Sequence, residues 1–337
     1  MRSPSPWSPL EAAIVTTAES ATRGTALRRD DVLDMIADRG VYVGLLLLVG
    51  FNLVFTPRFA EFDNIRLQFV QVVPVAIIAL GMALVIGTKG IDLSVGSVMA
   101  IASAVLALYL GYGPAVAITL ALLAGMAVGV ANGVLVAYFG VQPIVATLAL
   151  LVGGRGLALV IAQGRLTEIF DPFLGAIGSG RVLGLPYVVL IALAVAIGVA
   201  ILVSRTTFGR YIVAIGGNPD ASLLAGVPFR RSLIAVYVLS AGLAALAGII
   251  QTARLSASDP SFVGNLIELS AITAVVVGGT PLSGGRVRIV GTLAGALLMQ
   301  LIAATLITHD LPDSATRMIQ AAIIVGAVFI QRQRRGS

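Results

Sequence analysis

The chain has 337 residues, of which 58% are hydrophobic and 11% are charged, against roughly 25% charged residues in an average soluble domain. The apolar residues form long runs separated by short polar joints, which excludes a soluble enzyme. The chain has no cysteine and a single histidine, His309, which excludes disulfides, thiolate chemistry and histidine-based centres such as HExxH. We therefore expect no catalytic residues and no metal site.

The net charge of +6 comes from basic residues that lie at the ends of the apolar runs. This placement is typical of the orientation anchors of a membrane protein. No stripe of basic and aromatic residues suggests a surface for nucleic acid, so we expect no nucleic-acid partner.

Residues 1–40 are predicted to be a cytoplasmic N-terminal tail, partly disordered, because they lack an apolar core long enough for a signal peptide. Within this tail, the stretch from Asp30 to Arg39 is predicted to form a short amphipathic helix at the membrane interface.

The rest of the chain contains about ten apolar segments, most of them close to the ~20 residues that a helix needs to cross a bilayer. Backbone groups in lipid must be bonded within their own segment, so the fold class is an all-α integral membrane protein with about ten transmembrane helices. The predicted transmembrane domain spans residues 41–331, and residues 332–337 form a cytoplasmic C-terminal tail. The segments are 41–56, 69–88, 91–110, 114–139, 142–162, 186–204, 232–252, 266–282, 289–308 and 315–331.

The basic residues also predict the orientation in the membrane. With ten spans, 15 Lys and Arg residues fall on one side and six on the other, while Arg155 is left inside a span. The richer side is cytoplasmic, which places both termini there. The turn at Lys89 is open to two interpretations: it is cytoplasmic, or it is a break within the membrane.

The only long cytoplasmic loop covers residues 205–231. Asn218 can cap a helix whose first position is Pro219, Asp220 favours its positive end, and Gly226 ends it. The pattern predicts one or two helical turns, Asp220 to Ala225. A helix this short is marginal in water and needs a surface to dock on. The alternative is a plain connector packed against its own bundle.

If the protein moves a solute against a gradient, the residues that its spans lack limit the possible energy source. The only lysine, Lys89, does not belong to a phosphate-binding loop. Asp92 and Glu268 are the only acids in the spans, which argues against a proton- or sodium-driven pump. In the helix-turn motif Gly90, Asp92, Ser94 and Gly96, we expect a tight turn in which Asp92 caps the next helix.

Arg155 lies well inside a span, where a charge is costly and needs a partner. We hypothesise a contact between Arg155 and Glu268 that fixes helix packing or lines a pathway.

Polar but uncharged side chains in the spans suit a neutral hydrophilic solute, with interhelical hydrogen bonds as the alternative for each one. Gln71 and Gln300 are among these polar residues. The translocation-pathway candidates are Asn132, Gln142, Thr147, Arg155, Gln251, Glu268, Ser270 and Thr273.

Small residues predict close helix packing in two places: Gly125, Gly129 and Gly133 in one segment, and Gly291 with Gly295 in another. A short internal repeat is also present. LVIGTKGIDLSVG, which begins at Leu84, resembles VVVGGTPLSGG, which begins at Val275; each has an apolar run, a glycine turn and then Leu-Ser before another helix.

Several long motifs together resemble the permease subunits of bacterial ATP-binding-cassette importers of monosaccharides, the ribose-type permeases, over about residues 62–331. The galactofuranose permeases look closest, with ribose, xylose or arabinose permeases next. The motifs are GIDLSVGSVMAI from Gly90, QPIVATLALLVGGRGLALVIAQG from Gln142, FGRYIVAIGGNPDASLLAGV from Phe208, AGLAALAGIIQTARLSASDP from Ala241, AVVVGGTPLSGGRVRIVGTLAGALL from Ala274 and MIQAAIIVGAVFI from Met318.

The resemblance implies a multi-pass protein of the bacterial inner membrane that forms half of a translocation pathway and is not itself an enzyme. Its partners would be a second permease, identical or homologous, a periplasmic sugar-binding protein and a cytosolic ATPase that uses ATP and Mg. No cofactor would be bound by this chain. The loop 205–231 would be the segment that couples to the ATPase, through Gly209, Arg210, Gly216, Gly217, Asn218, Asp220, Leu223, Ala225 and Gly226.

The chain departs from the family at Ser270, where the family often has aspartate. Two other functions stay open on the residues alone: an ion-coupled secondary transporter, and a passive channel for a small polar solute.

Overall fold

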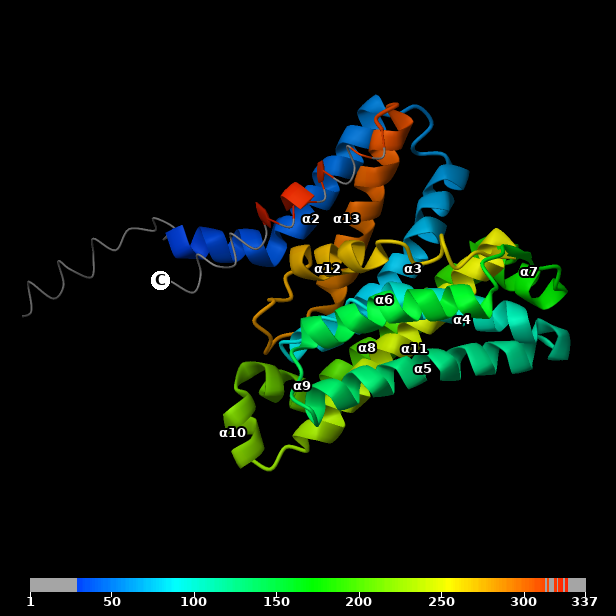
Figure 1. The fold of residues 1–337 in the computed structure, drawn as a ribbon. Helices are drawn as coiled ribbons and strands as arrows, with labels where there is room; N and C mark the ends of the chain where they lie inside the picture. Colours follow the sequence, from blue (N-terminus) through cyan, green and yellow to red (C-terminus); the bar gives the residue numbers. More distant parts are fainter. Residues whose placement is uncertain (1–28, 313, 315–317, 320, 324, 327–337) are drawn as a thin grey trace, which may run out of the picture.

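The computed structural model describes residues 29–312 and, beyond them, residues 314, 318, 319, 321–323, 325 and 326. The predicted C-terminal tail and most of the last predicted span, 315–331, lie outside the described residues, as does most of the predicted N-terminal tail. The described part is a set of packed helices (Figure 1), and its connections contain two very short strand pairs.

Within the described residues, helices lie at all of the predicted apolar segments up to residue 308. They are α2 (Arg29–Phe55), α3 (Phe62–Gly87), α4 (Val95–Tyr109) with the 3-10 turn η1 (Leu110–Tyr112), α5 (Pro114–Ala137), α6 (Pro143–Ile161), α8 (Tyr187–Arg205), α11 (Phe229–Leu255), α12 (Ile267–Val277) and α13 (Ile289–Thr308).

The connections contain shorter elements. They are β1 (Thr167–Glu168), α7 (Pro172–Ser179), β2 (Arg181–Val182), β3 (Leu185–Pro186), α9 (Thr207–Gly217), α10 (Pro219–Leu224) and β4 (Ala257–Ser258). β1 pairs with β4 and β2 pairs with β3, both antiparallel.

Seven of the described helices are long and apolar enough to cross a membrane: α3, α4 with η1, α5, α6, α8, α11 and α13. The apolar part of α2, Gly40–Phe55, and the 11-residue α12 are shorter apolar helices. Seven candidate spans indicate a multi-pass membrane protein. The total of about ten spans and the side of the termini stay predictions.

One boundary differs from the sequence analysis. The short interfacial helix predicted at Asp30 to Arg39 and the first predicted span form one continuous helix, α2, of 27 residues. Gly40 does not interrupt it, because a single glycine costs a helix only about 1 kcal/mol relative to alanine.

The buried core centres on α3, α4 and α11, which carry long series of buried residues, whereas α5, α6 and α8 bury only a few of theirs. Exposed apolar residues on these outer helices suit contact with lipid.

α5 lies along α11 (Figure 1), and the packing predicted for its glycines is confirmed: a Cβ at Gly129 would lie 2.7 Å from the carbonyl oxygen of Tyr237 on α11. Gly125 and Gly133 have similarly close neighbours on the same helix.

The internal repeat is visible in how α3 and α12 end. The amide of Gly90 donates to the carbonyl of Val85 at 3.0 Å, and the amide of Thr280 donates to the carbonyl of Val275 at 3.1 Å. Lys89 and Gly279, which stand just before these donors, have left-handed φ values of 67° and 86°. Both helices therefore end in a Schellman-type turn, at equivalent positions of the repeat.

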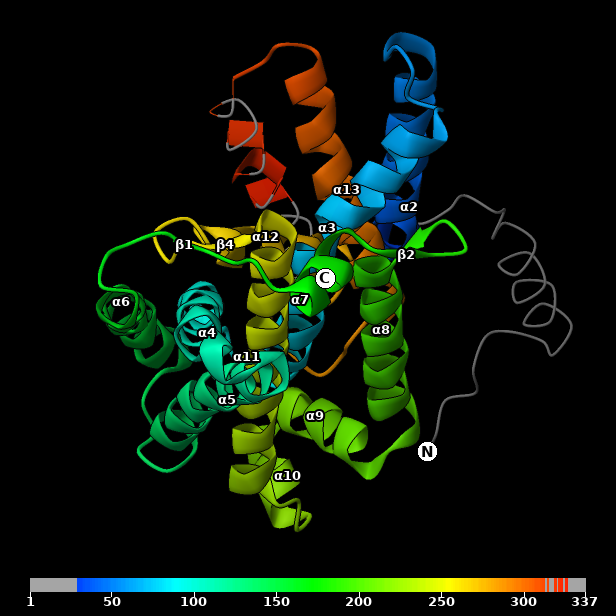
Figure 2. The same ribbon diagram turned by 90° about the vertical axis from the view of Figure 1, so that its right-hand side faces the viewer.

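The two ends of the bundle are occupied by different connections. α9 and α10 lie at one end of α8 and α11, and α7 with the strand pairs lies at the opposite end (Figure 2). The 163–185 connection therefore lies at the end of the bundle opposite to the 205–231 loop, which is predicted to be cytoplasmic.

Candidate functional site

A cavity of about 470 Å³ lies between α3, α11, α12 and α13 and is closed on one side by the 259–266 loop. None of the described residues that line it carries an ionisable side chain. Its polar and aromatic lining consists of Gln71, Gln251, Phe262, Asn265, Ser270 and Gln300.

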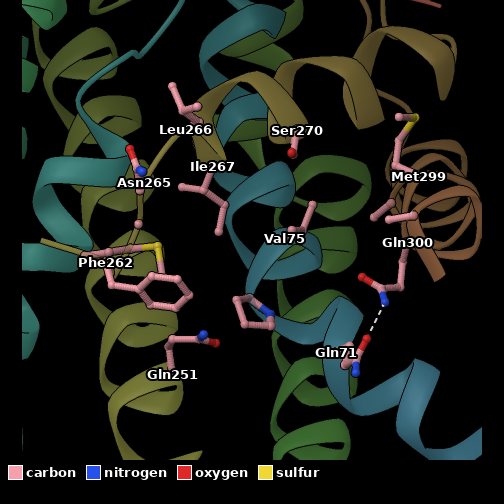
Figure 3. A pocket seen from close by; sticks show the side chains of 15 residues that line it. Gln71, Val75, Gln251, Phe262, Asn265, Leu266, Ile267, Ser270, Met299 and Gln300 are labelled. Atoms are coloured by element: carbon pink, nitrogen blue, oxygen red, sulfur yellow. Dashed lines mark hydrogen bonds between the residues drawn. The ribbon is translucent and has the colours of Figure 1, made fainter. Parts of the chain in front are cut away.

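Two of these side chains are joined across the cavity. Gln300 of α13 and Gln71 of α3 point toward each other (Figure 3), and the Gln300 Nε2 donates to the Gln71 Oε1 at 2.7 Å. The same Nε2 lies 3.3 Å from the Oε1 of Gln68. Amides such as these are unfavourable against lipid, so the face that carries them is suited to water, a polar solute or another protein.

The predicted contact between Arg155 and Glu268 is an electrostatic interaction and not an ion pair. Within the described residues no ion pair joins the two side chains; the guanidinium of Arg155 donates instead to the carbonyls of the loop beside the cavity. The distances are 2.8 Å to Pro260, 2.7 Å to Val263 and 3.0 Å to Gly264. A non-helical loop leaves carbonyls without partners, and the planar guanidinium fork can serve several at once. Arg155 thus holds the loop that lines the cavity.

Glu268, in the first turn of α12, is buried beside this loop. Its Oε2 has no hydrogen-bond partner among the described residues. Gly96 of α4 lies against both this carboxylate and the carbonyl of Gly264, where a Cβ would collide. The close contact joins the start of α4 to the start of α12.

Asp92 lies in the turn between α3 and α4 and is only 1% exposed. Its Oδ1 accepts from the amide of Ser94 at 3.0 Å and from the hydroxyl of Ser94 at 2.6 Å, and its Oδ2 accepts from the hydroxyl of Ser240 at 3.0 Å. The predicted helix cap is therefore wrong, because Ser94 itself occupies the cap position of α4. Asp92 closes the turn and ties it to α11.

Arg155 and Glu268 lie at the loop beside the cavity, and the other six pathway candidates separate into three groups. Gln251 and Ser270 line the cavity. Asn132 and Thr147 instead support the helix-turn motif, through hydrogen bonds of 2.8 Å to the Ser94 hydroxyl and 3.2 Å to the Ile91 carbonyl.

The other candidates lie elsewhere. Thr273 bonds the Leu269 carbonyl of its own helix at 2.7 Å. Gln142 precedes α6 and lines a smaller cavity of about 230 Å³, together with Gly90 of the helix-turn motif.

Asn265 and Phe262 were not predicted from the sequence, because they lie in a connection between two apolar segments. The available signal was the run Asp259-Pro260-Ser261, which is typical of a turn, followed by an aromatic residue and an amide. Gln71 and Gln300 were recognised as polar residues in spans but not as pathway candidates.

The 205–231 loop forms two helices, of which only the second was predicted. α10 has the predicted cap: the Oδ1 of Asn218 accepts from the amide of Ala221 at 3.1 Å, Pro219 is its first residue, and Gly226 follows with a φ of 76°. Leu224 is 91% exposed at its end. α9 begins at a second cap, where the hydroxyl of Thr206 accepts from the amide of Gly209 at 3.3 Å.

The predicted coupling residues divide between an exposed and a buried side of this loop. Gly209, which rests against the backbone of Val203, and Gly216 are buried. The exposed members are Arg210, Gly217, Asn218, Asp220, Leu223, Ala225 and Gly226.

Comparison with known proteins identifies the class. Residues 64–328 match the family model described as the permease component of branched-chain amino acid transport systems. No solved structure matches the chain.

Curated relatives agree with this class over most of their length. The chain is 40% identical to the ribose import permease protein of Escherichia coli K12 over 300 residues, which cover 87% of this chain and 93% of the relative. It is 40% identical to the galactofuranose transporter permease protein of the same strain over 263 residues, 77% of each chain. It is 32% identical to the L-arabinose transporter permease protein of Azospirillum brasilense over 313 residues, 92% of each. The chain belongs to this family of transport permeases.

Proposed function

We propose that this chain is the permease subunit of an ATP-driven importer of a monosaccharide and that it forms half of the translocation pathway. The observation that carries the proposal is the cavity, whose lining offers amides, a hydroxyl and an aromatic ring and no ionisable group. Neutral polyols are recognised by such groups. The relatives that import ribose, galactofuranose and arabinose support a sugar as the solute.

The cavity is the proposed solute path, with Gln71, Gln251 and Gln300 as its polar contacts. Solute must also leave the path, so weak contacts that differ between two states serve transport better than one tight site. Galactofuranose is the first solute to test, followed by ribose, xylose and arabinose.

The partners follow from the same proposal. A cytosolic ATPase, which binds ATP and Mg, docks on α10 through exposed residues such as Leu223 and Leu224. A second permease, identical or homologous, completes the path, and a periplasmic binding protein delivers the sugar. The protein lies in the bacterial inner membrane with both termini in the cytoplasm; the chain itself catalyses no reaction.

The experiment begins with purification of the tagged protein in mild detergent and identification of its partners by mass spectrometry. The complex is then placed in vesicles, and uptake of radiolabelled sugars is measured with and without ATP. Copurification of an ATPase and ATP-dependent uptake of one sugar are expected. Uptake by the permease alone without ATP would contradict the proposal and favour an ion-coupled transporter or a channel.

A further inference from the structure

Three backbone segments from distant parts of the chain meet at one point. They are the end of α3 at Gly87, the end of α9 at Gly216 and Gly217, and the turn between α12 and α13 at Gly284 and Gly285. The amide of Gly285 donates to the carbonyl of Gly87 at 3.0 Å. We call these five residues the glycine junction.

The junction has no room for a side chain at its centre. A Cβ at Gly216 would overlap both the Gly87 carbonyl oxygen and the Gly285 amide nitrogen, which are hydrogen-bonded to each other. A Cβ at Gly284 would lie 2.6 Å from the Cγ of Lys89. The backbone of α9 therefore touches the backbone of both partner segments directly.

Lys89 adds an exposed side-chain hydrogen bond at the edge of the junction. Its Nζ donates to the carbonyl of Gly217 at 3.2 Å. Lys89 has a φ of 67°, a conformation that is unfavourable for a residue with a Cβ, whereas the equivalent residue of the repeat is Gly279. A strained residue kept where glycine would fit points to a role for its side chain.

The segments that meet here continue to the cavity. α3 carries Gln71, and α13 carries Gln300. The side chains of Ile212 and Ile215 on α9 are fully buried, so α9 is packed into the bundle, while α10 beside it is exposed. A displacement of α10 can therefore reach α3 and α13 through α9 and the junction, in addition to the direct chain connection from α10 to α11.

We propose that the glycine junction is the place where the 205–231 loop acts on the helices that line the cavity, with Gly216 and Lys89 as positioning residues. This inference rests on the proposed coupling to an ATPase. The inference adds that α3 and α12, the helices of the two halves of the internal repeat, move together. The reason is that α9 contacts the backbone at the end of α3 and in the turn after α12.

The test uses the absence of natural cysteines in the sequence. Asn265→Cys places one exposed thiol at the cavity of the complex with its ATPase and binding protein, and the rate of maleimide labelling is measured with and without ATP and vanadate. We expect nucleotide to change this rate about fivefold, the low end of ordinary coupling between sites. Adding Gly216→Ala should leave the ATPase bound and hydrolysing ATP but abolish the change in labelling.

Gly198→Ala on α8 is the matched control, since a Cβ there has no neighbour within 4 Å, and it should keep the nucleotide response. If Gly216→Ala does not fold, Lys89→Gly serves instead. It relieves the backbone strain and removes the bond to Gly217 together with the side-chain contact on Gly284, and it should at least halve the response while the complex stays assembled.

The outcomes separate the two proposals. A full nucleotide response in an assembled Gly216→Ala complex would overturn the role of the junction. So would a full response in Lys89→Gly if the first variant does not fold. An Asn265→Cys complex that binds no ATPase would overturn the proposed function itself, and the inference with it.

Discussion

The cavity and the glycine junction lie along the same helices, α3 and α13, but they are built from different groups. The cavity is lined by amide side chains such as Gln71 and Gln300, which can rotate and exchange partners. The junction joins backbone to backbone, with Gly216 fitted against Gly87 and Gly285. The cavity can therefore adapt to a solute, whereas the glycine junction can only shift as a unit.

The largest loss of stability is expected at a second backbone contact between glycines, which lies outside the junction and joins α12 to α13. Gly291 of α13 packs against the carbonyl of Gly278 at the end of α12, so Gly291→Leu must push the two helices apart. We expect a loss of stability of about 3 kcal/mol or more, at the upper end for overpacking. Thermal unfolding in detergent, followed by size-exclusion chromatography, measures it. Gly50→Leu, where a Cβ has no neighbour within 4 Å, is the control and should change little.

The loop beside the cavity should show an intermediate effect. Arg155→Ala removes the donor of three carbonyls, and we expect a loss of about 2 kcal/mol because water can replace part of the bonding. Arg155→Lys should recover only part of the loss, since an ammonium group lacks the guanidinium fork. The same unfolding measurement applies, with Arg181→Ala at an exposed position as control.

Glu268→Gln distinguishes the two possible partners of Arg155. If the carbonyls are its partners, this variant should be as stable as the wild type, because Glu268 Oε2 has no hydrogen-bond partner in the described residues. A loss equal to that of Arg155→Ala would instead restore the ion pair.

A substitution in the cavity lining should have the smallest effect on stability. Gln300→Leu removes the hydrogen bond to Gln71, and we expect the variant to lose at most about 1 kcal/mol of stability. A lost contact of that size corresponds to about a fivefold fall in sugar uptake by vesicles. Thr308→Val, at the far end of the same helix, is the control for uptake. Unchanged uptake in Gln300→Leu with normal assembly would remove this residue from the path.

Local signals in the sequence predicted local structure well. α10 followed from the Asn218 cap, Pro219 and Gly226, which act within a few residues of one another. α9 was missed although Thr206 caps it and Ile212 and Ile215 supply its buried face, because a glycine-rich stretch inside a polar loop does not look helical.

Long-range partners could not be predicted. Arg155 and Asp92 were recognised as charged residues within spans, but their partners are loop carbonyls and the hydroxyls of Ser94 and Ser240. Any loop or helix can supply such groups, so no spacing in the sequence reveals them. The cavity was only partly predictable for the same reason: Gln251 and Ser270 lie in spans, but Asn265 and Phe262 come from a connection.

The small strand pair β1–β4 has a consequence for how the molecule opens. Thr167 and Glu168 pair with Ser258 and Ala257, and the amide of Ile169 donates to the carbonyl of Ser256 at 2.8 Å. These bonds run between main chains, so they join the 163–171 segment to the loop beside the cavity whatever side chains stand there. We therefore expect the two segments to open as one cooperative unit, with amide protons that exchange with solvent in the same event.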